Sequence, residues 1–127
     1  MKKIILIMFF VSSSLFAQLN WMNNVYDAYE RAEKEKKMVF VIISLKGCSS
    51  CAYMYDVVFK NQNVIKALEK DFVAVHLDIL EDFVPLELEH FVTPTLYFLD
   101  SNEKVLHRIN GYKNEKDFLD TLEMMVD

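Results

Sequence analysis

Apolar positions in the first half of the chain alternate between helical spacing and unbroken runs. Residues 20–35 place their apolar side chains at helical spacing and predict an amphipathic helix. The run at residues 38–43 is apolar and rich in β-branched residues, which is typical of a strand covered on both faces. Helical spacing returns from residue 48 to 68, with a break near residues 61–63. Residues 72–78 then predict a second buried strand.

The second half of the chain predicts a hairpin and a closing helix. Residues 79–91 show neither helical spacing nor the pattern of a strand clearly, and Pro85 argues against an unbroken helix through them. Two short strands are predicted at residues 95–99 and 105–109, separated by a polar turn. Residues 115–126 carry one apolar stripe and predict the last helix.

The order of these elements predicts an α/β fold. A strand–helix–strand unit followed by a strand–strand–helix unit gives a central mixed four-stranded sheet with helices on both faces, here with an added N-terminal helix. The first strand ends just before Cys48, at the sheet edge where sites of open α/β folds occur. Large aromatic residues at inward positions are expected in the core: Trp21, Phe40, Phe72, Phe91, Phe98 and Phe118.

The start of the chain has the pattern of a targeting segment. Two lysines precede an apolar stretch at residues 4–11, and small residues then lead to a cleavage site after Ala17. This pattern predicts a signal peptide at residues 1–17 and a single domain at residues 18–127. A retained membrane anchor is the alternative, but the apolar stretch is shorter than the roughly 20 residues that cross a bilayer. We therefore expect export to the periplasm.

Charge and composition narrow the choice of partner. The chain has 14 basic and 19 acidic residues, a formal net charge of −5, and loss of two lysines with the signal peptide would leave −7. We therefore expect no nucleic-acid partner. With only two glycines and two prolines, the composition also argues against flexible linkers and low-complexity segments.

Cys48 and Cys51 are the only cysteines, and two serines separate them. On a helix this spacing places both sulfurs on one face, within reach of a disulfide. Unpaired backbone N–H groups and the positive end of the helix dipole favour a thiolate at the first position. Cys48 is therefore the predicted nucleophile, and Cys51 would resolve a mixed disulfide. Tyr53 and Tyr55, just after the motif, are expected to cover the helix and not to border a substrate groove.

Three other interpretations of the cysteine pair remain open. A structural disulfide is common in exported proteins, but closing so short a loop restrains the unfolded chain by only about 2 kcal/mol. Structural zinc takes four ligands, and the histidines at positions 76, 90 and 107 have no ligand spacing. Two unrelated buried thiols would be expected in a more apolar segment. Redox chemistry is favoured, with no metal and no cofactor beyond a redox-active Cys48–Cys51 disulfide.

Several segments together resemble the thioredoxin-like family of small exported bacterial proteins, in which an N-terminal helix replaces the first strand of thioredoxin. The resemblance depends most on the CxxC motif followed, further along the chain, by Thr-Pro-Thr at the start of an apolar strand. The matching segments are residues 21–28, 39–43, 48–51, 72–78, 93–100 and 109–112. The chain departs from thioredoxin at Gly47, where thioredoxin has Trp, and at Ser49 and Ser50, where it has Gly-Pro. The redox potential of thioredoxin therefore does not carry over.

The resemblance implies roles for residues outside the motif. The Thr93–Pro94 bond is expected to be cis, with Pro94 against the cysteine pair and the backbone of Thr93 pairing with a substrate segment. His76 falls where thioredoxin has a lysine beneath the active site, and Ile42 replaces the buried acid that pairs with that lysine. Because an imidazole can accept a proton, we hypothesise that His76 assists deprotonation of Cys51. The alternative is a structural strand histidine.

These interpretations predict a thiol-disulfide oxidoreductase that exchanges electrons with cysteines of exported proteins through a Cys48 mixed disulfide. A threonine before the proline resembles secreted isomerases and reductants, so the expected direction is reducing or isomerising. Cycling then requires a membrane-bound reductant or oxidant as a partner. The alternative function is a peptide-binding adaptor of thioredoxin fold with a static disulfide, which a reduction potential below about −300 mV would indicate.

Overall fold

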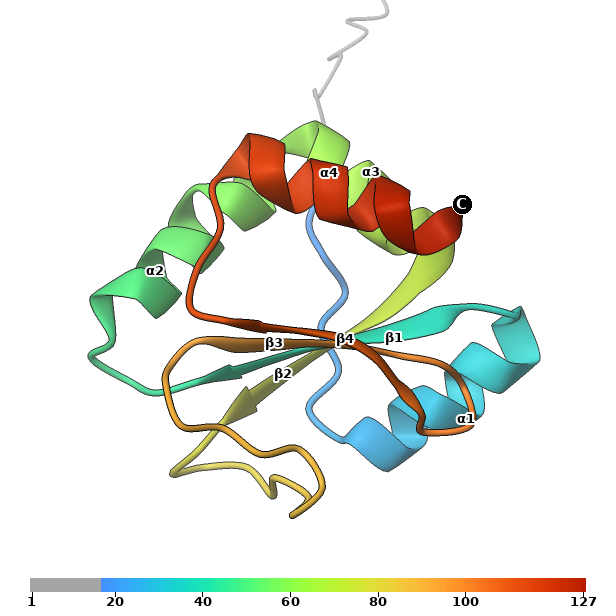
Figure 1. Cartoon of the computed structure of the whole chain (residues 1–127), viewed down its shortest axis with the longest axis horizontal. Helices are drawn as coiled ribbons and strands as arrows, with labels where there is room; N and C mark the ends of the chain where they lie inside the picture. The colour runs from blue at the N-terminus through green and yellow to red at the C-terminus, as the bar shows by residue number, and fades with distance from the viewer. Residues whose placement is uncertain (1–16) are drawn as a thin grey trace, which may run out of the picture.

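The centre of the fold is a mixed sheet of four strands. In the computed structural model, which describes residues 17–127, β1 (Met38–Ser44) pairs in parallel with β2 (Phe72–Asp78) and antiparallel with β3 (Thr95–Leu99). β4 (Val105–Asn110) pairs antiparallel with β3, which gives the strand order β2-β1-β3-β4 (Figure 1). The predicted fold class is therefore confirmed.

Helices cover both faces of this sheet. α2 (Ser49–Asp56), α3 (Gln62–Asp71) and α4 (Glu115–Val126) lie over one face, and α1 (Val25–Glu35) lies over the other (Figure 1). A short 3-10 helix, η1 (Val58–Lys60), joins α2 to α3, so the interruption lies a few residues before the break predicted near residues 61–63. Asparagine side chains cap three of the helices by accepting hydrogen bonds from N–H groups of the first turn: Asn24, Asn61 and Asn114.

The segment before α1 is extended, so the helix predicted from residue 20 begins only at Val25. Met22 forms a parallel β-bridge with the outer edge of β2. Its N–H donates to the carbonyl oxygen of Ala74 over 2.9 Å, and its own carbonyl accepts from the N–H of His76 over 2.8 Å. The predicted start was wrong because backbone groups on a free sheet edge need partners, and this segment supplies them.

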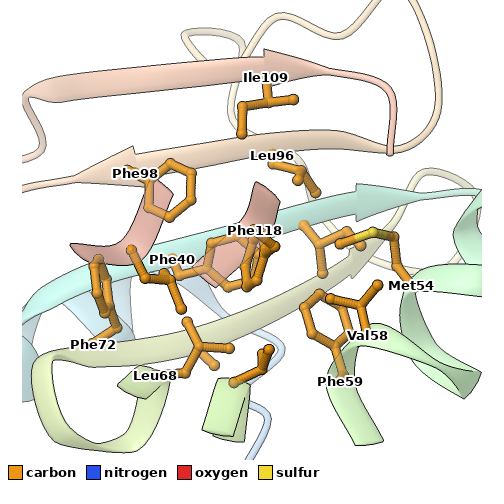
Figure 2. Close-up of a cluster of buried hydrophobic side chains, with 14 residues drawn as sticks. Phe40, Met54, Val58, Phe59, Leu68, Phe72, Leu96, Phe98, Ile109 and Phe118 are labelled. Atoms are coloured by element: carbon orange, nitrogen blue, oxygen red, sulfur yellow. The ribbon is translucent and has the colours of Figure 1, made fainter. Parts of the chain in front are cut away.

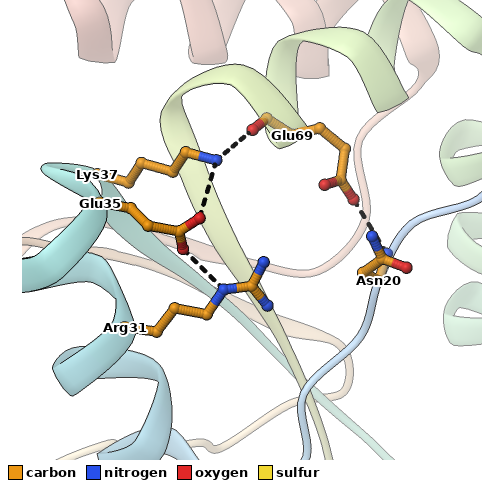
Figure 3. A network of polar contacts seen from close by, with 5 residues as sticks. All are labelled: Asn20, Arg31, Glu35, Lys37 and Glu69. Carbon is orange, nitrogen blue, oxygen red and sulfur yellow. Dashed lines mark hydrogen bonds and ion pairs between the residues drawn. The ribbon is translucent and has the colours of Figure 1, made fainter.

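A polar network fixes the position of the extended segment (Figure 3). The N–H of Asn20 donates to the Glu69 carboxylate over 3.0 Å, and the Lys37 ammonium donates to the Glu69 backbone carbonyl over 2.8 Å. Glu35 pairs with Arg31 at 2.7 Å and with Lys37 at 4.0 Å. The network thus joins the end of α1, the start of β1 and the last turn of α3 to the N-terminal segment.

The larger hydrophobic core lies between the sheet and the α2, α3 and α4 layer (Figure 2). Phe40 is at its centre, with ring centroids 5.2 Å from Phe98 and 5.4 Å from Phe118. Of the aromatic residues predicted for the core, Phe40, Phe72, Phe98 and Phe118 are buried and Trp21 is partly buried. Phe91 is 83% exposed, so its core assignment was wrong. It lies in a loop that leaves the sheet, which an apolar sequence pattern alone does not reveal.

A second core lies on the opposite face of the sheet, under α1. The connection from β2 to β3, residues 79–94, contributes to it; we call this segment the β2–β3 loop. Leu88 is buried in this core, and Ile79 and Val84 pack against it. The loop thus covers part of the face that α1 leaves open.

The predicted signal peptide, residues 1–17, lies outside the described residues apart from Ala17. Within residues 17–127, no helix combines the length and the apolar character that a membrane crossing requires.

Candidate functional site

The two cysteines lie where the loop after β1 leads into α2. Gly47 has a φ of 88°, a left-handed conformation that glycine adopts without strain. Cys48 is the N-cap of α2, and its Sγ accepts a hydrogen bond from the N–H of Cys51 over 3.2 Å. The two residues form a disulfide. Cys51 is 3% exposed whereas Cys48 is only half-buried, so Cys48 is the sulfur that a partner reaches more easily.

The β2–β3 loop returns to the cysteine pair at Thr93 and Pro94. The peptide bond between these residues is cis, and the carbonyl oxygen of Thr93 lies 3.5 Å from the Sγ of Cys48. The N–H of Gly111 donates to the carbonyl of Pro94 over 2.8 Å, which ties this turn to the end of β4. The fold thus brings together the CxxC motif and the Thr-Pro pair, which are far apart along the chain.

His76 lines a cavity of about 400 Å³ that it shares with both cysteines. The Nε2 of its imidazole lies 3.1 Å from the Oγ of Ser44. The hydroxyl of Tyr55 donates to the same Ser44 oxygen over 3.4 Å. The rings of Tyr55 and Trp21 pack edge-on against the imidazole, with centroids 5.1 and 6.3 Å away. His76 therefore lines the same cavity as the two cysteines, and its imidazole contacts Ser44 and is not hydrogen-bonded to either sulfur.

Sequence reasoning missed Ser44 and assigned Tyr55 only to covering the helix. A signal for each residue was present. Ile42 lies opposite His76 in the parallel register, and Ser44 lies two positions further along β1, on the same face. Tyr55 follows Cys51 by four positions on α2, so both side chains lie on one side of that helix. A polar residue at the end of an apolar strand and a tyrosine one turn after a cysteine were the available clues.

The environment of Tyr55 decides the direction of this hydrogen-bonded chain. Burial raises the pKa of Tyr55 well above its ordinary value; the hydrogen bond to Ser44 lowers that pKa, and the negative charges of Asp78 and Asp82 raise it. The net effect keeps the Tyr55 hydroxyl protonated, so it remains a donor. Ser44 accepts this hydrogen bond and keeps its own hydroxyl hydrogen, so the Ser44 hydroxyl links Tyr55 to Nε2 of His76.

Acidic residues at the end of β2 hold the turn beside the cavity. The Asp78 carboxylate accepts the N–H groups of Leu80 and Glu81 over 2.8 and 3.3 Å, and the Asp78 N–H donates to Asp82 over 2.7 Å. These bonds assign Asp78 a role in shaping the start of the β2–β3 loop. Within residues 17–127, no group of three or more His, Cys, Asp or Glu residues is placed to hold a metal ion.

A second hollow opens on the other side of the CxxC motif. It has a volume of about 500 Å³ and is lined by Ser49, Ser50, Tyr53, Tyr112 and Asn114. The rings of Tyr53 and Tyr112 meet edge-on with centroids 5.5 Å apart. Tyr53 packs against the larger core, as expected of a residue that covers the helix, and it borders this hollow as well.

Solved structures with a similar fold include proteins that handle disulfides. A proposed disulphide-isomerase from Bacteroides thetaiotaomicron is 27% identical, with a TM-score of 0.73, over 87% of this chain and 94% of that one. A thioredoxin from Thermus thermophilus is 22% identical, with a TM-score of 0.70, over 87% of this chain and 88% of that one. The second similarity concerns the fold alone.

Matches among curated proteins are shorter. An uncharacterized protein of Archaeoglobus fulgidus is 27% identical over 61% of this chain and 64% of its own length. Human spermatogenesis-associated protein 20 is 30% identical over 47% of this chain, which is 8% of that protein. The sequence pattern of the thioredoxin-like domain matches residues 25–125, from the start of α1 almost to the end of α4. The chain therefore belongs to the thioredoxin-like domain family.

Proposed function

We propose that the protein is a thiol-disulfide oxidoreductase that exchanges electrons with cysteines of other proteins through a mixed disulfide at Cys48. The observation that carries this proposal is the position of Cys48 at the N-terminus of α2, half-buried, with the Thr93 carbonyl 3.5 Å away. Backbone amides and the helix dipole stabilise a thiolate at that position. Membership of the thioredoxin-like family and the similarity to a proposed disulphide-isomerase support the same activity.

The reducing direction proceeds in two exchange steps. The Cys48 thiolate attacks one sulfur of a client disulfide; the Cys48–client bond forms as the client S–S bond breaks, and the released thiolate takes a proton from water. Cys51 then loses its proton and attacks the Sγ of Cys48, which releases the second client thiolate and forms the Cys48–Cys51 disulfide. The client gains two electrons, and an external dithiol must return them to the pair. In isomerisation, another client thiol attacks the mixed disulfide instead, so no net electrons move.

Thr93 and Pro94 are proposed to bind the client backbone. An extended segment can pair with the main chain of Thr93 as an added strand would. Pro94 has no N–H, so it leaves no unpaired donor at the start of β3. Because the Thr93 carbonyl lies beside the Cys48 sulfur, a segment bound there would present its own sulfur to Cys48.

His76 is proposed to receive the proton of Cys51 during resolution, with Ser44 between them. The cavity shared by these residues has room for water, and the Ser44 hydroxyl already contacts Nε2 of His76 at 3.1 Å. A proton leaving the Cys51 thiol can pass through water and the Ser44 hydroxyl to His76. Tyr55 then acts as a positioning residue that holds the Ser44 oxygen.

The cellular setting follows from the sequence prediction. We propose that the protein is exported, that it acts on cysteine-containing exported proteins in the periplasm, and that a membrane-bound dithiol protein supplies its electrons. The predicted signal peptide supports export. The net charge of −5 argues against nucleic acid as a partner.

The proposal is tested with reduced protein, a peptide disulfide and two matched variants. Cys51→Ser should accumulate a stable mixed disulfide with the peptide, because attack occurs and resolution does not. Cys48→Ser should form none. Wild-type protein should pass rapidly through this species to an intramolecular disulfide, as followed by acid quenching and mass spectrometry.

Two results would contradict the proposal. One is trapping through Cys51 when Cys48 is replaced, with none in the converse variant. The other is a reduction potential below about −300 mV together with no exchange, which would indicate the adaptor with a static disulfide.

A further inference from the structure

Large apolar side chains are exposed along the β2–β3 loop. Leu86 is 93% exposed, Phe91 83% and Leu80 77%. Leu86 and Phe91 line one hollow of about 270 Å³, and exposed apolar area that gathers in this way marks an interaction site more often than an accident of packing. We call these side chains the apolar loop surface: Leu80, Phe83, Leu86, Phe91 and Val92.

The loop that carries these exposed side chains is itself held in place by buried contacts and hydrogen bonds. Leu88 is buried in the second core, the Tyr97 hydroxyl donates to the Glu89 carbonyl, and the Thr95 hydroxyl donates to the Val92 carbonyl over 2.6 Å. Leu88 already covers the sheet face below the loop. These contacts fix the backbone that carries the exposed apolar side chains.

Both ends of the β2–β3 loop lie near the cysteine pair. Glu81, next to Leu80, lines the cavity that both cysteines also line. Thr93, next to Val92, places its carbonyl oxygen 3.5 Å from the Sγ of Cys48. A polypeptide segment that reaches Cys48 along Thr93 would thus pass directly onto the apolar loop surface.

The charge of the loop defines the partner further. Residues 79–92 contain four acidic residues, Glu81, Asp82, Glu87 and Glu89, and no lysine or arginine. The complementary partner carries basic residues beside its apolar ones. The same charge disfavours an anionic lipid surface, and a second copy of this acidic chain would bring like charges together.

We propose that the apolar loop surface binds an extended, unfolded segment of a client polypeptide, in which apolar residues and lysine or arginine flank the reacting cysteine. This inference rests on the proposed function and names its substrate class: unfolded chains, recognised before native packing hides their apolar residues. Pairing at Thr93 orients the segment, and the loop surface selects its side chains.

The test uses three synthetic peptides, each carrying one cysteine as its glutathione mixed disulfide. One has Phe, Leu and Lys flanks, the second replaces Lys by Glu, and the third has Ser and Asn flanks. Each reduction rate is divided by the rate with dithiothreitol, which removes differences in intrinsic reactivity. Wild-type protein should reduce the apolar, basic peptide at least about tenfold faster than the polar one, the equivalent of about 1.4 kcal/mol. The normalised reduction rate of the peptide with Glu should lie between the rates of the other two peptides.

Two double variants identify the surface. Leu80→Ser/Phe91→Ser should lose most of the preference between peptides while reducing glutathione disulfide at the wild-type rate. Val105→Ser/Leu106→Ser removes two exposed apolar side chains from β4 and should keep the preference. Phe83→Ser/Leu86→Ser provides a second test of the loop if the first variant proves unstable in urea unfolding.

The inference fails if both loop variants keep the wild-type preference, or if the wild type reduces glutathione disulfide without distinguishing the peptides. It also fails if sedimentation shows a dimer that Leu80→Ser/Phe91→Ser dissolves, since the surface would then pair two copies. Binding to phosphatidylcholine vesicles that the same variant abolishes would assign the surface to a membrane instead. Failure to exchange with glutathione disulfide and with every peptide would overturn the proposed function itself.

Discussion

The two sulfurs of the site differ in exposure and in electrostatic setting. Cys48 is half-buried at the N-terminus of α2, whereas Cys51 is one turn inside the helix and 3% exposed. A thiolate needs both stabilisation and access to react with a solution reagent. Only Cys48 has both.

Alkylation of the reduced protein near neutral pH should therefore modify Cys48 much faster than Cys51. Limited treatment with iodoacetamide, followed by peptide mass spectrometry, gives the ratio of the two products. Protein denatured in urea is the control, since the two thiols should then react at similar rates. Equal rates in the folded protein would show that the position of Cys48 confers no advantage.

Ser44→Ala removes the hydroxyl between Tyr55 and His76. If this hydroxyl carries the proton of Cys51, resolution of the mixed disulfide should slow by about tenfold or more, because a positioned acid–base group typically contributes at least that much. The first attack by Cys48 should keep its rate. Stopped-flow exchange between about pH 5.5 and 8, where an imidazole ordinarily titrates, separates the two steps.

A double-mutant comparison distinguishes a shared path from separate structural effects. His76→Ala should slow the same step as Ser44→Ala, and the double variant should be no slower than the worse single variant. Tyr55→Phe keeps the ring that packs on His76 but removes the hydroxyl donor, so a smaller effect on the same step is expected. Additive losses in the double variant, or equal losses in both steps, would mean that Ser44 and His76 only support the fold.

At the scale of elements, the sequence pattern located most of the secondary structure. The bounds predicted for β2, β3 and α4 are those observed, since the two strands are nearly unbroken apolar runs between polar segments and the helix carries one apolar stripe. The helix predicted from residue 20 failed because helical spacing is a local property, whereas the edge of β2 that holds Met22 is formed by distant residues.

Met22→Pro tests the bridge that replaces the predicted helical turn. Proline has no N–H to donate to the Ala74 carbonyl, so the free energy of unfolding should fall by about 1–3 kcal/mol. Met22→Ala keeps the backbone bond and serves as the matched control for the lost side chain. Urea denaturation followed by circular dichroism measures both. Equal stabilities for the two variants would show that the bridge contributes nothing.

Tyr29, on the buried face of α1, makes stability depend on alkaline pH. Burial, followed by the charges of Glu103 and Glu87, raises its pKa from 10.0 to about 12. Above pH 10 the unfolded chain loses this proton while the folded chain keeps it, so stability is full below pH 10 and falls as pH rises towards 12. The loss should reach about 3 kcal/mol.

Tyr29→Phe should reduce the loss of stability between about pH 10 and 12. Urea unfolding at intervals from pH 8 to about 12 would show a smaller alkaline loss in the variant than in the wild type. The loss caused by the raised pKa of Tyr55 remains in both proteins and cancels in the comparison. Parallel profiles would show that Tyr29 ionises as freely in the folded state as in the unfolded one.

At the scale of the whole molecule, the site forms where two layers meet. α2 supplies the sulfurs from one face of the sheet, and the β2–β3 loop, packed on the other face, supplies Thr93 and the apolar loop surface (Figure 1). Motifs predicted the cysteines and the Thr-Pro pair. No motif marks Ser44 as a site residue, because its contact with His76 depends on the register between two strands.

Trp21 is placed so that its fluorescence can report on the candidate active site. It is the only tryptophan in the chain, and its ring packs edge-on against Tyr55 and His76, with centroids 5.8 and 6.3 Å away. Because Tyr55 and His76 line the cavity that both cysteines share, the emission of Trp21 should differ between the oxidised and the reduced protein. His76→Gln should alter that difference, and an unchanged difference would show that Trp21 does not sense the site through His76. The redox state of the site can then be followed by light, in the unlabelled protein, while exchange proceeds.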